Sequence, residues 1–171
     1  MPGASDAEFQ EFAATYSRRL FRTACLLTSG DWHAAEDLLQ ETLGKLYPRW
    51  RKVSRMEWPF AYAHTTLVRI YIAQQRRKSS TERTTDSVPE RAHRAKGDPE
   101  LRLALLDGLG ALAPHDRAVL VLRYWEDRSV EQTAEMLDLS EGAVRVRSHR
   151  ALDRLRGLLG DQLAGLALDR P

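Results

Sequence analysis

Residues 129–156, SVEQTAEMLDLSEGAVRVRSHRALDRLR, carry the clearest structural signal in the chain. Ser129 and Gln132 form a capping box, in which two side chains satisfy backbone N–H groups at the start of a helix. A turn of three residues, 138–140, follows this short helix, and its last residue, Ser140, caps a longer helix. Asp138 stands in the turn where a positive φ is often needed, which Asp tolerates better than most residues. Two capped helices joined by so short a turn are typical of a helix-turn-helix.

The longer helix of this motif is markedly basic. Between residues 141 and 156, five arginines stand against Glu141 and Asp153. Arginine recognises phosphates and guanine edges, glutamate accepts from the cytosine amino group, and valine contacts the thymine methyl group. An ordinary helical hairpin with a solvated basic face is the alternative, but the capping, the turn length and the local charge together favour DNA binding. We therefore expect a major-groove surface made of Glu141, Arg145, Val146, Arg147, His149 and Arg150.

Helical periodicity continues through the rest of the chain, with no strand-like alternation of useful length. The second half begins at Asp98, an expected N-cap, and Pro99, an expected first helical residue. Three amphipathic helices are expected in the first half. The first helix is expected to start at a capping box of Ser5 and Glu8 and to stop near Ser29 and Gly30. The second is expected to start at Asp31 and to end or bend at Pro48, and the third to start at Pro59.

Residues 79–98 lack this periodicity, and Val88 is their only sizeable apolar residue. A segment of this composition cannot bury enough apolar surface to fold by itself, so it is interpreted as a linker. Its twenty residues span up to about 65 Å when fully extended. We therefore predict an all-α chain of two small helical domains, residues 1–78 and 99–171, which move semi-independently about a flexible linker.

A second candidate surface lies on the third helix of the first half, opposite its apolar stripe. Aromatic, hydroxyl and arginine side chains suit single-stranded or melted DNA, because stacking and backbone neutralisation need no duplex. Core positions for Trp58 and Tyr62 are equally compatible with the sequence. The residues of this surface are Tyr62, Thr65, Thr66, Arg69 and Arg76 on the helix, with Met56 and Trp58 in a loop before it.

Length and composition exclude several classes of protein. The chain has 171 residues, of which 43% are hydrophobic and 29% charged, so it can form a real core but no membrane span. Its N-terminus lacks the pattern of a secretory signal, and we expect a cytoplasmic protein. Cys25 is the only cysteine, which excludes an internal disulfide. The histidines are scattered, and no metal-binding, nucleophile-elbow or phosphate-loop motif occurs, so we expect no enzyme, metal or cofactor.

Three blocks of sequence resemble the extracytoplasmic-function class of bacterial RNA polymerase sigma factors, and within it the SigE-like actinobacterial group. The blocks are AEDLLQETL at residues 35–43, the segment 59–77, and the segment from Leu112 to Arg156. They occur in the order found in that family and span most of residues 9–158. A match of several ordered blocks is far more specific than a helix-turn-helix alone.

The resemblance implies a function for each part of the chain. The first domain would open promoter DNA and hold the −10 element, and the second would read the −35 element. Core RNA polymerase would be the obligate partner, bound through Asp37, Gln40 and Glu41 on the second helix. The free chain would be a monomer that needs no cofactor, and an anti-sigma protein is a further candidate partner.

Three positions depart from the family pattern. Pro48 interrupts the second helix, Asp138 replaces the common turn glycine, and Ser148 replaces an inward apolar residue. A buried Ser148 hydroxyl would need an acceptor, and a carbonyl one turn back is expected to supply it. The competing function is a dimeric helix-turn-helix regulator whose first lobe senses a ligand. A separate acidic helix and an aromatic and arginine surface favour the sigma factor, since a repressor needs neither.

Overall fold

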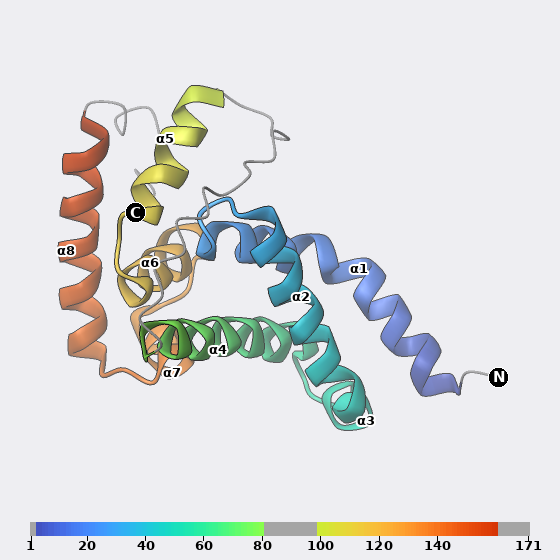
Figure 1. Cartoon of the computed structure of the whole chain (residues 1–171). Coiled ribbons are helices and arrows are strands. Elements are labelled where there is room, and N and C mark those ends of the chain that lie inside the picture. The colour runs from blue at the N-terminus through green and yellow to red at the C-terminus, as the bar shows by residue number, and fades with distance from the viewer. Residues whose placement is uncertain (1–2, 81–98, 161–171) are drawn as a thin grey trace.

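The computed structural model describes residues 3–80 and 99–160, and within these ranges every regular element is helical (Figure 1), which confirms the all-α fold class. Helix α4 crosses the middle of the molecule, with α8 upright on one side and α1 extending from the other. In chain order the elements are α1 (Ala4–Leu27), α2 (Trp32–Leu46), the 3-10 turn η1 (Tyr47–Arg49), α3 (Trp50–Val53), α4 (Pro59–Ser80), α5 (Pro99–Gly110), α6 (Pro114–Leu120), the π-helical segment η2 (Val121–Trp125), α7 (Val130–Leu137) and α8 (Glu141–Leu159).

The first half of the structure, residues 3–80, is built from α1, α2 and α4 packed on one another. Leu20, Leu38 and Leu67 lie on the inner faces of these three helices and are fully buried, as their helical periodicity predicts. Pro48 ends α2, because a proline lacks the N–H and the space that a continuing helix needs. The predicted break is therefore confirmed, and the chain continues through η1 into the single turn of α3.

The start of α1 differs from the prediction. The helix begins at Ala4 with Gly3 as its N-cap, and the Gly3 N–H donates to Asp6 Oδ2 at 3.1 Å. Ser5 therefore lies inside the helix, and the capping box of Ser5 and Glu8 is wrong. An acidic residue in the first turn satisfies the cap amide and interacts favourably with the helix dipole, so Asp6 performs the function assigned to Glu8.

The helix-turn-helix is built as predicted. Ser129 Oγ accepts from the Gln132 N–H, and Gln132 Oε1 accepts from the Ser129 N–H, both at 3.0 Å. Asp138 has a φ of 54° in the left-handed region. Ser140 Oγ accepts from the Ala143 N–H at 3.0 Å. These local hydrogen bonds set where α7 ends and where α8 begins, and hence the direction in which α8 leaves the turn.

Helix α8 packs on α5, α6 and α7, which together form the second half, residues 99–160. Leu109, Leu120 and Leu155 are fully buried at its centre. Gly108 lets α5 approach α8 closely, because a Cβ at this position would lie 2.7 Å from Leu155 Cδ1. Pro99 begins α5 as predicted, and the N-cap predicted at Asp98 lies outside the described residues.

The two halves share one hydrophobic core. Leu67 and Ile72 of α4 belong to the same buried cluster as Val119, Leu122 and Met136 of the second half, and α7 lies against α4. The described residues therefore form a closed arrangement, in which the two halves are in direct contact. The linker predicted at 79–98 falls almost entirely outside the described residues, and the division of the chain into two domains stays a prediction.

Candidate nucleic-acid interface

The outer face of α8 is exposed, whereas Val144, Ala151 and Leu155 on its inner face are buried. Val146 keeps 56% of its surface exposed although it is apolar. Arg145 Nη2 lies 3.5 Å from Glu141 Oε2, an exposed pair that contributes little to stability and can be exchanged for a DNA contact. Five of the six predicted residues lie on this exposed face, namely Glu141, Arg145, Val146, His149 and Arg150.

The sixth predicted residue, Arg147, turns toward α6. Its Nη1 donates to Asp116 Oδ1 at 2.9 Å, and 33% of its side chain is exposed. This ion pair holds α8 on α6, and a DNA contact by Arg147 stays a prediction. Ser148 Oγ is buried and has no hydrogen-bond partner within the described residues. The expected bond from this hydroxyl to a carbonyl one turn back is therefore wrong.

The second candidate surface lies on the start of α4 and on the loop before it. Trp58 is 69% exposed, which excludes the core position that the sequence left open. Tyr62 is half-buried and packs against the core with one side, while the Thr66 hydroxyl donates to the Tyr62 carbonyl at 2.8 Å. Met56 and Thr65 are half-buried as well. The structure thus places one exposed aromatic ring, that of Trp58, beside a half-buried polar face of α4.

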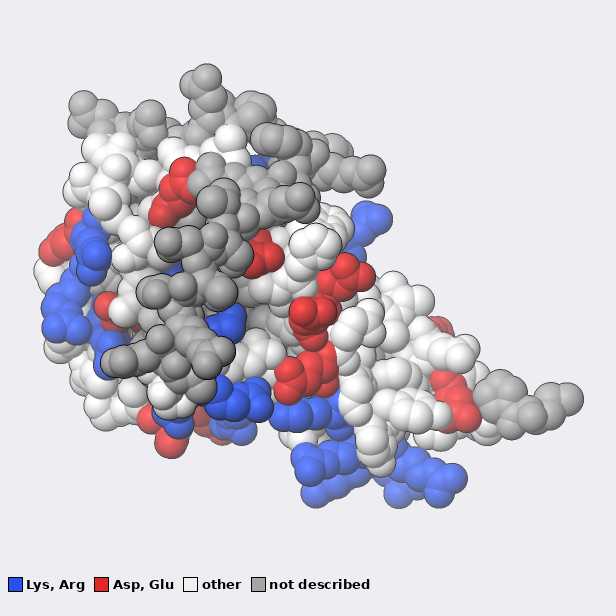
Figure 2. Space-filling view, viewed as in Figure 1, with Lys and Arg blue, Asp and Glu red and all other residues white. Residues whose placement is uncertain are grey.

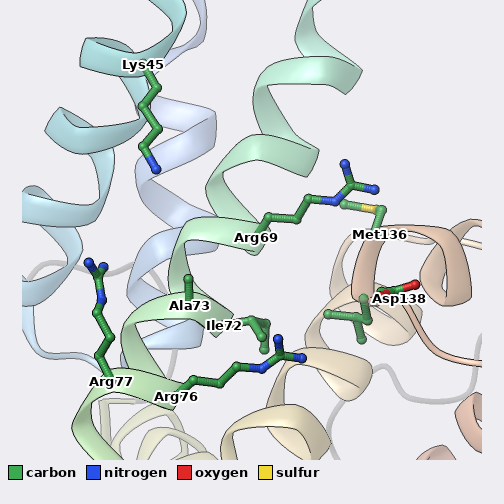
Figure 3. A pocket seen from close by; sticks show the side chains of 9 residues that line it. Lys45, Arg69, Ile72, Ala73, Arg76, Arg77, Met136 and Asp138 are labelled. Carbon is green, nitrogen blue, oxygen red and sulfur yellow. The ribbon is translucent and has the colours of Figure 1, made fainter.

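Further along α4, Arg69 and Arg76 line a groove between α2, α4 and the end of α7 (Figure 3). The groove has a volume of about 610 Å³ and is lined by Lys45, Arg69, Ile72, Ala73, Arg76, Arg77, Met136, Leu137 and Asp138. Four of these side chains are cationic and one is acidic, so the groove attracts anionic groups. Arg69 Nη2 also donates to the Glu135 carbonyl of α7 at 3.2 Å.

Two cations of this groove were missed in the sequence. Arg77 belongs to the basic run at residues 76–78, which is a visible signal, although only Arg76 of that run was among the predicted residues. Lys45 lies on α2, and only the packing of α2 against α4 brings it to the groove. A basic cluster drawn from separate helices leaves no spacing pattern in the sequence.

The exposed side of α2 is acidic. Figure 2 shows acidic side chains gathered over α2 and basic side chains over the neighbouring α3. Asp37 and Gln40 are exposed. Glu41 is half-buried, accepts from Gln74 Nε2 of α4 at 2.7 Å and lies 3.8 Å from Lys45 Nζ. Two of the three residues predicted to bind polymerase therefore face solvent, while Glu41 also holds α2 against α4.

Residues 3–80 and 99–160 contain no group of three or more His, Cys, Asp or Glu side chains placed to hold a metal ion. None of the helices in this described part of the chain is both long and apolar enough to cross a membrane. Burial raises the pKa of the Cys25 thiol to about 11, so the thiol is protonated at neutral pH.

Known proteins resemble this chain along most of its length. The family "Sigma-70, region 4" matches residues 108–157. The RNA polymerase sigma-E factor of Streptomyces coelicolor is 36% identical over 165 residues, which cover 95% of this chain and 93% of that protein. The ECF RNA polymerase sigma factor SigL of Mycobacterium tuberculosis is 30% identical over 163 residues, covering 90% and 92% of the two chains. The chain belongs to the extracytoplasmic-function class of RNA polymerase sigma factors.

A solved structure has the same architecture. The sigma factor RpoE from Bartonella quintana, solved in complex with the anti-sigma factor NepR, matches with a TM-score of 0.68 and 26% identity over 95% of this chain and 99% of that one. The present sigma factor is therefore a DNA-binding initiation factor that binds core RNA polymerase and directs promoter-specific transcription. The family resemblance drawn from the three sequence blocks is confirmed, and the dimeric regulator is not supported.

Proposed function

We propose that this sigma factor uses three separate faces for its partners. The face of α8 reads the −35 element, the loop before α4 together with the polar face of α4 holds the −10 element, and α2 docks on core polymerase. One observation carries the proposal: the arginine-bearing face of α8 is exposed, and so are Trp58 before α4 and Arg69 and Arg76 on α4, while the opposite sides of both helices are buried.

The −35 element is read by base-directed contacts from α8. Replacing Arg145 or Arg150 with alanine should weaken −35 binding by about 1 to 3 kcal/mol if each contacts a base. Arg154 provides a matched control for Arg145, because it is exposed on the same helix but lies nine residues from Arg145, on the opposite side; it shares the face of Arg150, four residues before it, and is no control for that residue. The test is run-off transcription with core polymerase on promoters with intact and mutated −35 elements. Equal activity of Arg145→Ala and Arg154→Ala would remove the assignment, and Arg147 can be tested in the same series.

The −10 element is captured as single-stranded bases by the loop and by α4. Unstacking a base costs a few kcal/mol. Contacts of the base with the predicted side chains would offset this cost, namely Met56, Trp58, Tyr62, Thr65 and Thr66. Arg69 and Arg76 would neutralise the backbone of the melted strand. Replacing Tyr62 and Arg69 together with alanine should leave closed-complex binding nearly intact but reduce strand opening, measured by permanganate reactivity. An equal loss of both steps would indicate that this surface is structural.

The acidic face of α2 is the polymerase-docking surface, made of Asp37, Gln40 and Glu41. The exposed carboxylate of Asp37 supports this assignment, since an exposed acidic face can meet a basic one without a large desolvation cost. Asp37→Lys should lower the affinity for core polymerase about tenfold or more, while Glu11→Lys, a charge reversal on the exposed side of α1, should not. The same loss in both variants would point to net charge rather than to a docking site.

Three further assignments complete the proposal. The chain is divided into domains at residues 1–78 and 99–171, with 79–98 as the connection that lets the two DNA-reading faces separate. It acts in the cytoplasm, without catalysis and without a cofactor. An anti-sigma protein regulates it, as the solved relative with NepR suggests by analogy. Purification from cells at native abundance, followed by identification of bound proteins, tests the last point.

A further inference from the structure

The Glu41 carboxylate of α2 is held by an amide from another helix. The amide belongs to Gln74 of α4, which packs against α2. Gln74 Nε2 donates to Glu41 Oε2 at 2.7 Å, and Lys45 Nζ lies 3.8 Å from Glu41 Oε1. The contact with Lys45 is an exposed ion pair between residues four apart on one helix, so it orients the carboxylate only weakly. Gln74 is therefore the main group that orients Glu41.

Buried residues fix the backbone of both helices beneath this hydrogen bond. On α2, Leu38 before Glu41 and Thr42 after it are fully buried, and the Thr42 hydroxyl donates to the Leu38 carbonyl at 2.7 Å. On α4, Tyr71 is fully buried three residues before Gln74, so the Gln74 side chain leaves the helix on the same side. Donor and acceptor thus come from two well-packed segments, which present them to each other in one arrangement.

The hydrogen bond leaves Glu41 able to bind a partner. Its side chain remains 36% exposed. An ionised carboxylate can accept hydrogen bonds at about four positions, and the Gln74 amide occupies one of them. Because the amide is neutral, it orients the carboxylate without cancelling its charge, as a lysine in the same place would. Glu41 therefore offers a negative charge and open acceptor positions in a defined orientation.

The neighbouring Asp37 gives this support a further effect. Asp37 is exposed and lies four residues before Glu41, so the two carboxylates share one face of α2. Like charges at this spacing repel each other and destabilise the helix. A hydrogen bond to a carboxylate is stronger than one between neutral groups, so the bond from Gln74 offsets this repulsion. The α4 amide thus supports the acidic face as well as orienting one of its members.

We propose that Gln74 is a positioning residue for the binding of core polymerase, which holds the Glu41 carboxylate in the orientation in which α2 docks. This inference rests on the docking surface of Asp37, Gln40 and Glu41 assigned under Proposed function. A free surface side chain loses rotamer freedom when it binds, and Gln74 removes that freedom from Glu41 before the polymerase arrives. Immobilising one such side chain lowers an affinity by about two- to tenfold, which is the contribution expected of Gln74.

The test measures the affinity of the whole chain for immobilised core polymerase by biolayer interferometry. The test variant is Gln74→Met, because methionine is also unbranched but has no hydrogen-bond donor. Its matched control is Gln75→Met, the same change at the next residue, which is half-buried like Gln74 but lies about 100° further around α4. Both substitutions are also combined with Glu41→Ala, so that the effect of Gln74 is measured with and without the carboxylate.

Gln74→Met should weaken binding about two- to tenfold, and Gln75→Met should bind as the wild type does. In the Glu41→Ala background, Gln74→Met should weaken binding no further, because its effect passes through the Glu41 carboxylate. A substitution that only damaged the packing of α2 on α4 would weaken binding by the same factor in both backgrounds, and this result would overturn the positioning role. Gln74→Asn draws the amide back by one methylene group, so it should give the same loss, and it replaces Gln74→Met if that variant does not fold.

The Glu41→Ala variant separates this inference from the assigned docking surface. If Glu41→Ala weakens binding and Gln74→Met does not, Glu41 docks without support from α4, which contradicts the positioning role alone. If Glu41→Ala binds as the wild type does, the carboxylate takes no part in docking, and the roles of both Glu41 and Gln74 are overturned.

Discussion

Lowering the pH from 7 to 5 should destabilise this protein through His64. The side chain is fully buried in α4, its ring stacks on Phe60 with centroids 5.8 Å apart, and its charged neighbours are Glu126, Arg128 and Arg19. Burial is the main reason that the pKa of His64 falls from 6.5 to about 4. An unfolded chain returns this histidine to its ordinary pKa, so the unfolded state binds a proton at pH 5 that the folded state does not.

The size and sign of the effect follow from this difference. Because the pKa of the folded state lies below that of the unfolded state, the stability is fully present above about pH 6.5 and is lost as the pH falls from there toward 4. From pH 6.5 to 5 the loss is about 1.5 pH units at about 1.4 kcal/mol each, or about 2 kcal/mol of unfolding free energy. This is a large share of the stability of an ordinary small domain.

Urea unfolding at pH 7 and pH 5 measures the loss, and His64→Gln provides the comparison because glutamine keeps an amide donor but does not titrate in this range. The variant should lose about 2 kcal/mol less than the wild type between the two pH values. Burial, followed by Arg147 and Arg76, lowers the pKa of His115 too, but this group is present in both proteins and cancels in the difference. Equal losses in the two proteins would refute the assignment of a buried, neutral His64.

Three other predictions test the packing that positions the DNA-reading helix. Gly108→Ala should lower the unfolding free energy by about 1 to 3 kcal/mol in urea titrations, because the new alanine Cβ would lie 2.7 Å from Leu155 Cδ1. If the variant is as stable as the wild type, α5 and α8 can move apart at no cost. Asp138→Gly should stabilise the chain by about 0.5 to 1 kcal/mol and so raise the thermal midpoint, because φ is 54° at this residue and glycine adopts such a φ without strain. A lower midpoint would contradict backbone strain at Asp138. Asp116→Ala should destabilise the chain about as much as Arg147→Ala does, because each removes one partner of the 2.9 Å ion pair. Unequal losses by calorimetry would assign one of the two side chains a role beyond that pair.

The helix-turn-helix could be predicted almost completely because its signals are local. The capping of Ser129 and Ser140 and the positive φ of Asp138 each involve side chains and backbone within four residues, so the sequence contains both partners of every interaction. The same holds for Pro48 and Pro59, which end and begin helices through their own covalent geometry. The start of α1 was missed because several polar residues near Gly3 could cap it, and the pattern alone does not choose among them.

The candidate surfaces were predictable only as far as periodicity reaches. Spacing places Arg145 and Arg150 on the outer face of α8, and they are exposed there. Arg147 was predicted together with them although its spacing from the buried Val144 and Ala151 places it toward the inner face, and its long side chain turns there to Asp116 on another helix. Lys45 was missed at the groove for the same reason, since its neighbours there come from α4 and α7.

The sequence by itself determined the helical class, the helix-turn-helix and the family, because these depend on short-range spacing and on ordered blocks along the chain. Only the tertiary structure decided how the halves meet. The partners of Arg117 include Leu27 and Tyr71, and Glu126 lies against Thr23 and His64, all far away along the chain. No spacing rule links residues so distant, because their contact arises from the packing of whole helices and not from the conformation of any one segment.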